Sequence, residues 1–286
     1  MTVFRDNFRL LPDIFSFLQN NPSGEVLLTT SKGVYLQFSS RILLLTLDKY
    51  GIIPNGLSLS RFADFLTEIS PKPGQRVAIS DGVLRFPGGD LAGIWNISEP
   101  VRSLGVPLPQ QVNFCADKLV TQCSQRSLAN LTDPLLRNRS PVTEDHPHST
   151  RALPLLHQLL QALRNTGNVE TPVRQLLGLG LGLTPSCDDI LLGMLYGLLR
   201  FAPQEASTAA LRQTILTYAP SHTNAISAAY LTAVAQGEYY ELLDQQLLAL
   251  CSKTPIDIQP ILQVGSSSGS EMLLGLLLAA HIHMKG

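Results

Sequence analysis

Over the first hundred residues, apolar residues form short runs that are separated by turn-forming residues. The runs are rich in Val, Leu, Tyr and Phe, which favours strands, and Asp81-Gly82 between two of them is a signal for a tight hairpin turn. Residues 59–69 instead repeat their apolar positions at helical spacing, so we expect a helix that covers the sheet. The predicted strands are residues 25–30, 33–38, 41–47, 76–80, 83–86 and 91–97.

After about residue 115, the spacing of apolar residues changes from every second residue to the 3.6-residue repeat of a helix. We therefore expect no further strand. The predicted fold class is therefore α+β: a β-rich N-terminal part, a meander or barrel-like sheet with one or two helices, followed by an all-helical C-terminal part. The predicted helices are residues 116–129, 152–164, 171–177, 187–201, 207–218, 223–236, 238–251, 257–263 and 271–284.

Residues 131–150 interrupt the helical pattern with three prolines and several polar residues. Such a segment is either a surface excursion or a connection between domains. We therefore predict a β-rich α+β domain over residues 1–112, a helix and linker over 113–150, and a helical domain over 151–286.

Composition and charge narrow the classes of protein. With 44% hydrophobic and 15% charged residues, the chain is too apolar for disorder, and we expect a partner to bury part of its surface. A net charge of −1 does not favour nucleic-acid binding. The longest apolar runs, residues 190–199 and 272–282, are shorter than the roughly 20 residues that span a bilayer, so we expect no membrane segment. Without a CxxC pair or an N-terminal leader, the four cysteines are expected to be free thiols of a cytoplasmic protein.

The most informative segment is the glycine loop, which we define as residues 178–189. Gly178, Gly180 and Gly182 stand at alternate positions, and Thr184-Pro-Ser-Cys-Asp-Asp leads into an apolar helix. Glycine lets a ligand approach the backbone closely, and the amides of a helix N-terminus favour a bound anion. The loop is neither a Walker loop nor a dinucleotide fingerprint, because no Gly-Lys-Ser/Thr follows and no GxGxxG follows a strand. We therefore predict an anion site at this loop.

Part of this segment is repeated further along the chain. Residues 186–195 line up with residues 268–277 at an offset of 82 residues (268 − 186), and both segments begin Ser-x-x-acid-x-Leu-Leu-Gly. The second copy also follows a polar loop of small residues. Two helix N-termini of this kind could face one another around a single cleft.

A simpler interpretation of the repeat is helix capping. Ser186 with Asp189, and Ser268 with Glu271, have the spacing of capping boxes. Capping does not explain the glycines or the additional carboxylate of Asp188. Adjacent carboxylates at a helix start suit a bound cationic group or a divalent cation, for which Mg²⁺ is the candidate, although the sequence defines no set of metal ligands.

A third group of polar residues lies between the two copies. Thr223 and Ser227 are four residues apart and share one helix face, where their hydroxyls would reach a common space. A threonine N-cap followed by an ordinary helix has the same pattern, so both interpretations stay open.

Histidine and cysteine give weaker signals. His146 and His148 could hold a metal, but a solvated loop explains them more simply. His281 and His283 lie near a helix C-terminus, where we expect them to complement the helix dipole. Cys187 stands beside the glycine loop, where a lowered pKa would make it a nucleophile, a role that we regard as minor.

These motifs resemble those of the AllH-like family. The family hallmark resembles Gly-x-Gly-Leu-Thr-Pro-Ser-Gly-Asp-Asp-x-Leu-x-Gly, which residues 180–193 match. A Thr-x-x-x-Ser segment is matched by Thr223 and Ser227, and a closing Ser-Gly-x-acid-x-Leu-x-Gly by residues 268–275. The motifs fall within residues 150–286. The sequence departs from the pattern at Cys187, where the family usually has glycine, and at Glu271, where it usually has aspartate.

The resemblance implies a subunit of an oxamate carbamoyltransferase-type complex. Such complexes act in purine and allantoin breakdown and convert oxalurate and phosphate to oxamate and carbamoyl phosphate. The implied partners are a small anionic metabolite, an FdrA-like subunit and a further subunit. The two departures indicate that the substrate could be another acid. The alternative is a non-catalytic scaffold or metabolite-sensing subunit of such a complex.

The resulting candidate site combines two catalytic and twelve substrate-binding residues. Asp188 and Asp189 are the expected catalytic residues. The expected substrate-binding residues are Gly180, Gly182, Thr184, Pro185, Ser186, Thr223, Asn224, Ser227, Ser267, Ser268, Gly269 and Glu271.

Overall fold

The computed structural model of the 286-residue chain describes residues 2–97, 105–139, 147–165 and 167–285. The chain divides into two compact units. Unit 1 contains Met1–Val101 together with Tyr239–Leu242, and unit 2 contains Arg102–Glu238 and Leu243–Gly286. Each unit is described by itself below.

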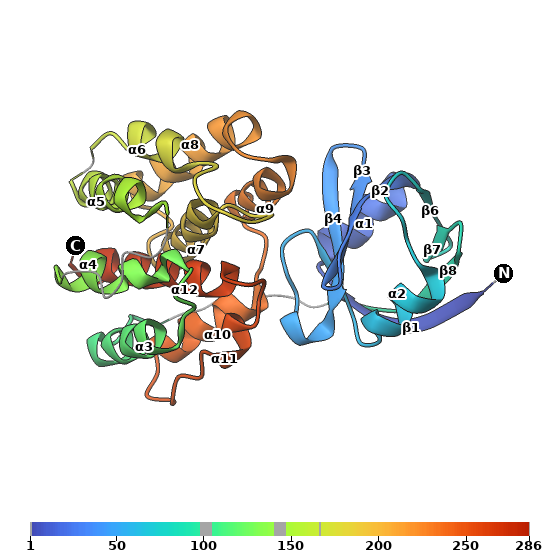
Figure 1. The fold of residues 1–286 in the computed structure, drawn as a ribbon, viewed down its shortest axis with the longest axis horizontal. Coiled ribbons are helices and arrows are strands. Elements are labelled where there is room, and N and C mark those ends of the chain that lie inside the picture. Colours follow the sequence, from blue (N-terminus) through green and yellow to red (C-terminus); the bar gives the residue numbers. More distant parts are fainter. Residues whose placement is uncertain (1, 98–104, 140–146, 166, 286) are drawn as a thin grey trace. The chain divides into compact units, whose positions relative to one another are not determined.

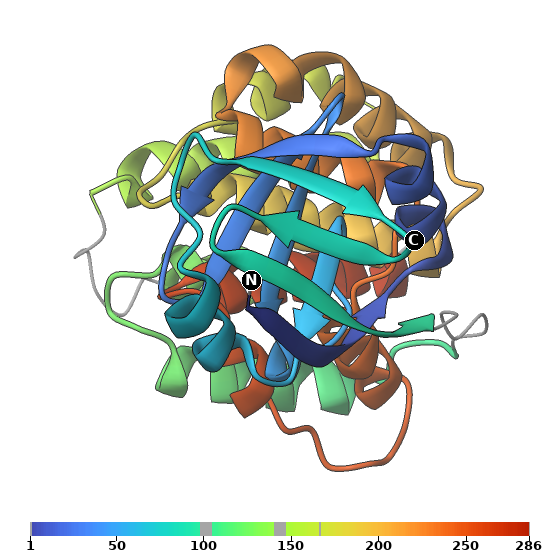
Figure 2. The ribbon, with the colours of Figure 1, turned by 90° about the vertical axis from the view of Figure 1, so that its right-hand side faces the viewer.

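Unit 1 is a closed eight-stranded barrel with two α-helices (Figures 1 and 2). The strands follow one another around the barrel in the order β1-β5-β4-β3-β2-β6-β7-β8. Their bounds are β1 Val3–Leu10, β2 Ser23–Thr29, β3 Gly33–Phe38, β4 Arg41–Leu47, β5 Gly56–Leu59, β6 Arg76–Ser80, β7 Val83–Phe86 and β8 Gly89–Ile97. The helices are α1 Pro12–Asn20, α2 Phe62–Ile69 and the 3-10 turn η1 Asp48–Tyr50.

Two parallel strand pairs close this barrel. β1 runs parallel to β8 from Val3↔Asp90 to Leu10↔Ile97, and β4 runs parallel to β5. The remaining neighbours are antiparallel, and four of these pairs join consecutive strands as hairpins. At the β6–β7 hairpin, Asp81 and Gly82 both have positive φ, 53° and 72°, as a tight primed turn requires.

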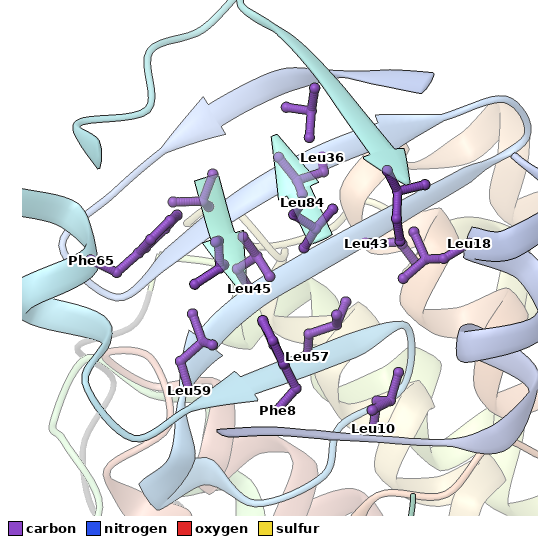
Figure 3. Close-up of a cluster of buried hydrophobic side chains, with 14 of the residues drawn as sticks. Phe8, Leu10, Leu18, Leu36, Leu43, Leu45, Leu57, Leu59, Phe65 and Leu84 are labelled. Carbon is purple, nitrogen blue, oxygen red and sulfur yellow. The ribbon is translucent and has the colours of Figure 1, made fainter. Parts of the chain in front are cut away.

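Apolar side chains fill the interior of the barrel (Figure 3). Phe8, Leu36, Leu45 and Leu57 are completely buried there, and α2 adds Phe65. Burial of each such side chain stabilises the unit by roughly 1.5–3 kcal/mol. The alternating apolar pattern of the sequence therefore encodes one shared core.

The structure confirms the predicted α+β class and all six predicted strands to within a few residues. β1, β5 and α1 were not predicted from the sequence pattern. In β1, Arg5-Asp6-Asn7 interrupts the apolar alternation, although Phe4 and Phe8 on either side are buried. Asp6 is polar for a structural reason, because its carboxylate accepts a hydrogen bond from the Arg61 amide at 2.7 Å.

The described residues of unit 2 form helices and connecting loops, with no strand among them. Figure 1 shows α7 and α12 in the middle of the unit, with α6 and α8 on one side and α3 and α11 on the other. The bounds are α3 Pro109–Gln122, η2 Leu128–Leu131, α4 Thr132–Arg137, α5 Ser149–Arg164, α6 Glu170–Leu176, α7 Ser186–Phe201, α8 Ala206–His222, α9 Ala225–Ala235, α10 Glu241–Leu250, α11 Gln259–Leu262 and α12 Ser268–Lys285. α7 is buried on every side from Ser186 to Leu198, which explains its apolar sequence.

Two helix predictions were wrong. The predicted helix 116–129 is α3, which lies at Pro109–Gln122 because Pro109 is suited to the first helical turn. The segment 131–150 was expected to be a surface excursion or a connection between domains, and no helix was predicted there, but it contains α4. Of its remaining residues, 140–146 lie outside the described ranges. None of the helices in the described ranges has both the length and the hydrophobicity needed to cross a bilayer.

Candidate functional site

The two repeated sequence segments form two helices, α7 and α12, that pack against each other. Equivalent residues of the two helices make the same contacts. A Cβ atom on Gly193 of α7 would lie 1.9 Å from the carbonyl oxygen of Met272 in α12. A Cβ atom on Gly275 of α12 would lie 2.1 Å from the carbonyl oxygen of Ile190 in α7. Each residue of one contact stands 82 positions from its counterpart in the other. The repeat is therefore also a repeat in space, with glycine where the two backbones touch.

The two helices run in the same direction. One turn beyond the contacts of Gly193 and Gly275, a Cβ atom on Gly197 would lie 2.6 Å from the Cβ of Ala279, which is its own equivalent in the repeat. Moving toward the C-terminus of α7, the contacted residues thus also move toward the C-terminus of α12. Parallel helices have their N-termini at the same end, so the partial positive charges of two helix dipoles lie together there.

At these N-termini, the serine of each helix binds the acid of the other helix rather than the acid of its own. The capping-box interpretation is therefore wrong. Pro185 is the N-cap of α7, and no side chain caps this helix. The hydroxyl of Ser186 instead donates to Glu271 of α12. In the equivalent contact, Ser268 of α12 donates to Asp189 of α7. Each serine therefore binds the acid of the other helix, and these contacts join the two N-termini.

Asp188 binds the glycine loop to the start of α9. Its side chain is buried and accepts hydrogen bonds from the Gly178 amide at 2.8 Å, from Thr223 Oγ1 and from Ser227 Oγ at 2.7 Å. Burial raises the pKa of this carboxyl, while the three donors act in the opposite direction. The spacing of Thr223 and Ser227 is thus explained, because both hydroxyls donate to one carboxylate.

Asn224 makes a second connection between the loop and α9. Its Nδ2 donates to the Leu183 carbonyl at 2.9 Å, and its Oδ1 accepts from the Ser227 amide at 3.0 Å as the N-cap of α9. Both ends of the Asn224 amide are used, so this residue holds the loop in place. The alternative interpretation of Thr223 as the N-cap is wrong, because Asn224 has that role.

Asp189 lies between the two helix N-termini. Its side chain is buried, and Oδ2 accepts from Thr184 Oγ1 at 2.9 Å, while the Ser268 hydroxyl lies 3.1 Å from Thr184 Oγ1. Burial raises the pKa of Asp189 well above its ordinary value, and the nearby charges of Glu271 and Asp188 raise it further. Such surroundings disfavour the ionised form of the carboxyl, so Asp189 takes up a proton more readily than an exposed aspartate.

Glu271 connects α12 to a segment that the sequence analysis missed. It is fully buried, and Oε1 accepts from the Leu128 amide at 3.1 Å and from Ser127 Oγ at 3.4 Å, while Oε2 accepts from Ser267 Oγ at 3.2 Å. Burial raises the pKa of Glu271, and these donors together with Ser186 oppose the rise. Ser127 is also the N-cap of η2, with its side chain accepting from the Ala129 amide.

The three loop glycines take backbone conformations that other residues rarely adopt. Gly178, Gly180 and Gly182 have φ values of 75°, 138° and 102°. A Cβ atom on Gly180 would lie 2.2 Å from the Ser186 amide nitrogen, and one on Gly178 would lie 2.5 Å from the His222 carbonyl oxygen. Glycine is therefore required at these two positions by both conformation and space.

The tip of the loop is exposed. Leu181 is 56% and Leu183 41% exposed, while Thr184 is partly exposed. Within the described part of the chain, no hydrogen bond is made by the amides of Gly180, Leu181, Gly182 and Leu183. The loop thus presents several N–H donors beside the N-terminus of α7.

The remaining candidate residues are structural neighbours of this centre. Pro185 is buried at the start of α7, and Ser267 donates to Glu271. Gly269 allows α12 to pass close to the backbone of α11, because a Cβ atom there would lie 1.7 Å from the Ile261 carbonyl oxygen. The candidate residues of the glycine loop, of 223–227 and of 267–271 therefore converge on the N-termini of α7, α9 and α12.

The structure does not support the predicted role of His281. Burial lowers the pKa of His281 to about 4, with Lys285 and Arg164 acting in the same direction. His281 is therefore neutral at neutral pH and does not complement the helix dipole as predicted. His283 stacks on Phe201 with ring centroids 5.6 Å apart. Among the described residues, no group of three His, Cys, Asp or Glu side chains is arranged to hold a metal ion, and His146 lies outside them.

We expect Cys187 to resist alkylation in the folded protein. Its side chain is fully buried, and burial raises the pKa of the thiol far above its ordinary value, as do the charges of Asp188 and Glu271. The nucleophilic role considered above needs a lowered pKa and is therefore wrong. All four cysteines are free thiols, as predicted. Mass spectrometry after iodoacetamide treatment should find Cys123 and Cys251 modified before Cys187; equal labelling of Cys187 would contradict its burial.

Comparison with known proteins agrees with the sequence motifs. No solved structure matches the chain. Residues 176–280, from the end of α6 into α12, match the model of the family described as oxamate carbamoyltransferase subunit AllH. The matched range contains the glycine loop, the start of α9 and both helices of the repeat. This match agrees with the resemblance drawn from the motifs and supports an AllH-like family assignment over residues 176–280 of the helical unit.

Proposed function

We propose that the chain is a subunit of a carbamoyltransferase-type complex and binds a small carbamoyl or acyl anion at the glycine loop. The reaction of such a complex would convert oxalurate and phosphate to oxamate and carbamoyl phosphate, or be a paralogous reaction with another acid. The family match over residues 176–280 supports the class of complex. The further subunits, an FdrA-like one among them, are partners that the same proposal implies.

One observation carries the anion site: residues 180–183, which are exposed or partly exposed, precede α7 and their amides have no protein acceptor among the described residues. Backbone N–H groups at a helix N-terminus bind carboxylate and phosphate oxygens. The same donors would stabilise the oxyanion that forms when a nucleophile attacks a carbamoyl carbon. The glycines keep this backbone accessible.

Asp188 has a positioning role in this proposal. Its side chain is 1% exposed, and three protein donors use its oxygens. It is therefore placed to fix the shape of the loop through Gly178, with Thr223 and Ser227 holding the carboxylate from α9. The ligand would meet the amides of the loop tip and the partly exposed Thr184.

We expect Asp188→Asn to weaken anion binding at least tenfold. An amide cannot accept from all three donors, because one of its two polar atoms is itself a donor. The loop then loses a fixed connection to α9, and its amides lose their alignment. The measurement is calorimetric titration of the full chain with oxamate, oxalurate, phosphate and carbamoyl phosphate, with and without Mg²⁺.

Asp244→Asn is the matched control for this substitution. Asp244 is also a fully buried, hydrogen-bonded aspartate of unit 2, held by Arg200 at 2.8 Å, but it lies on α10. This variant should keep the wild-type affinity. Unchanged binding in a folded Asp188→Asn variant would disprove the role of Asp188, and equal losses in both variants would indicate general destabilisation instead.

A second candidate function is a non-catalytic scaffold or metabolite-sensing subunit of the same kind of complex. The exposure of Leu181 and Leu183 at the tip of the loop favours it, because apolar side chains beside a ligand site can contact a partner subunit. Turnover of carbamoyl phosphate and oxamate by the isolated chain would support the enzyme. Activity of the partners without this chain, altered only in its ligand response when the chain is added, would support the sensing subunit.

A further inference from the structure

We propose that anion binding at the glycine loop is coupled to the uptake of one proton by Asp189, with Thr184 as the side chain that changes its hydrogen bond. In the free protein the Thr184 hydroxyl donates to Asp189, and in the bound protein it donates to the anion. This inference rests on the proposed function, since it describes how the same site takes its ligand.

The geometry places Thr184 between the buried carboxyl and the surface. Thr184 is partly exposed on the loop, whereas Asp189 is only 4% exposed. Thr184 Oγ1 lies 2.9 Å from Asp189 Oδ2. A hydroxyl has a single proton to donate. While the carboxylate is ionised, that proton is used by Asp189, and the oxygen of Thr184 offers an incoming anion only lone pairs.

Protonation of Asp189 reverses this arrangement. A carboxyl that carries its proton on Oδ2 donates to Thr184 Oγ1, and the Thr184 proton becomes free to point toward the loop tip. The proton on Asp189 comes from solvent, and no covalent bond to the ligand forms or breaks. Ser268, which also donates to Asp189, lies 3.1 Å from Thr184 Oγ1 and belongs to the same hydrogen-bonded group.

The surrounding charges favour this uptake. Glu271 from α12 and Asp188 from α7 itself are the charged groups that act on Asp189, and both raise its pKa together with burial. α9 contributes the hydroxyl of Ser227 to Asp188, and the described residues of α8 add no charge that acts on Asp189. Arg151 of α5 acts on the neighbouring Cys187. A bound anion adds another negative charge, which favours the protonated form of Asp189 further.

The test measures proton uptake during binding by the full-length wild-type chain. Oxamate is the probe, because its carboxylate stays ionised around neutral pH. Titrations in two buffers of different ionisation enthalpy give the number of protons taken up, which should approach one. The dissociation constant should rise with pH by up to about tenfold per unit between the pKa of Asp189 in the free and in the bound protein.

Three variants separate proton uptake from binding. Asp189→Asn resembles the protonated carboxyl, so it should bind oxamate with no proton uptake and no pH dependence. Glu271→Gln removes a charge that raises the pKa of Asp189, so its pH dependence should shift to lower pH while uptake persists. Thr184→Val lacks the switching hydroxyl and should bind several-fold more weakly at all pH values. Thermal melting checks that each variant is folded.

The outcomes distinguish this inference from the proposed function. Oxamate binding by the wild type without proton uptake overturns the coupling but leaves the anion site in place. Undiminished uptake in a folded Asp189→Asn variant also overturns it, because another group must then take the proton. No binding of oxamate or carbamoyl phosphate by the folded chain overturns both the coupling and the proposed anion site.

Discussion

Gly193→Ala is expected to lower the free energy of unfolding of the helical unit by about 3 kcal/mol. The added Cβ would lie 1.9 Å from the Met272 carbonyl oxygen, so α7 and α12 must move apart. Alanine by itself favours a helix over glycine by about 1 kcal/mol, which opposes but does not outweigh the loss of packing. Because the contact is repeated, Gly275→Ala against Ile190 should have a similar effect. Urea unfolding followed by far-ultraviolet circular dichroism measures both.

The control for these substitutions is Gly105→Ala in the same unit. A Cβ atom there meets its nearest neighbour, the Cβ of Cys251, at 3.5 Å, which is an ordinary contact. This variant should stay within about 0.5 kcal/mol of the wild type. A Gly193→Ala variant that is more stable than the wild type would show that helix propensity dominates and that the close approach of the two backbones is wrong.

Asp189→Asn is expected to stabilise the protein at high pH. Burial and Glu271 raise the pKa of Asp189 well above its ordinary value. Between the ordinary and the raised pKa, the folded protein therefore holds a proton that the unfolded chain has released. The free energy of unfolding then falls as pH rises through this window, by up to about 1.4 kcal/mol per pH unit, and becomes constant above the raised pKa. Asparagine carries no such proton and avoids this loss.

The measurement is the difference in unfolding free energy between Asp189→Asn and the wild type over a series of pH values. This difference should grow with pH, because Asp188 and Glu271 remain in both proteins and their own titration largely cancels. Gly105→Ala, which replaces no ionisable group, is the control and should give a difference that does not change with pH. A flat difference for Asp189→Asn would show that its carboxyl is not destabilised by burial.

A buried acid that lowers the stability of the folded protein is expected to serve its function. The three carboxylates at the N-termini of α7 and α12 meet hydroxyl and amide donors, and no lysine or arginine pairs directly with them among the described residues. Polar sites that lower stability are commonly retained for function. The burial of Asp189 beside Glu271 and Asp188 would then explain both the loss of stability and the proposed proton uptake.

The local sequence pattern was sufficient for most elements of the fold. Alternating apolar residues predicted the strands from β2 to β8 except β5, and helical spacing predicted α2 and the central helices. It was insufficient where polar residues serve distant contacts. β1 was missed because Asp6 binds the start of α2, and that contact depends on residues more than fifty positions away.

For the candidate site as well, the local pattern predicted the segments involved but not the contacts between them. The glycines, the adjacent aspartates and the repeat at an offset of 82 residues were visible in the sequence. The roles of individual residues were not: Ser186 and Ser268 have the spacing of caps, but each binds the acid of the other helix. Ser127, which donates to Glu271 from 144 positions away, had no signal that linked it to the site.

By itself, the sequence determined the α+β class, the change from strands to helices, and the loop on which the candidate chemistry is concentrated, because periodicity and glycine spacing are local properties of the chain. The tertiary structure alone decided that α7 and α12 lie parallel with their N-termini together, that their acids are buried, and that the Cys187 thiol is buried beside them. Burial and charge proximity raise the pKa of a side chain only through neighbours brought close by folding, and no local pattern contains those distances.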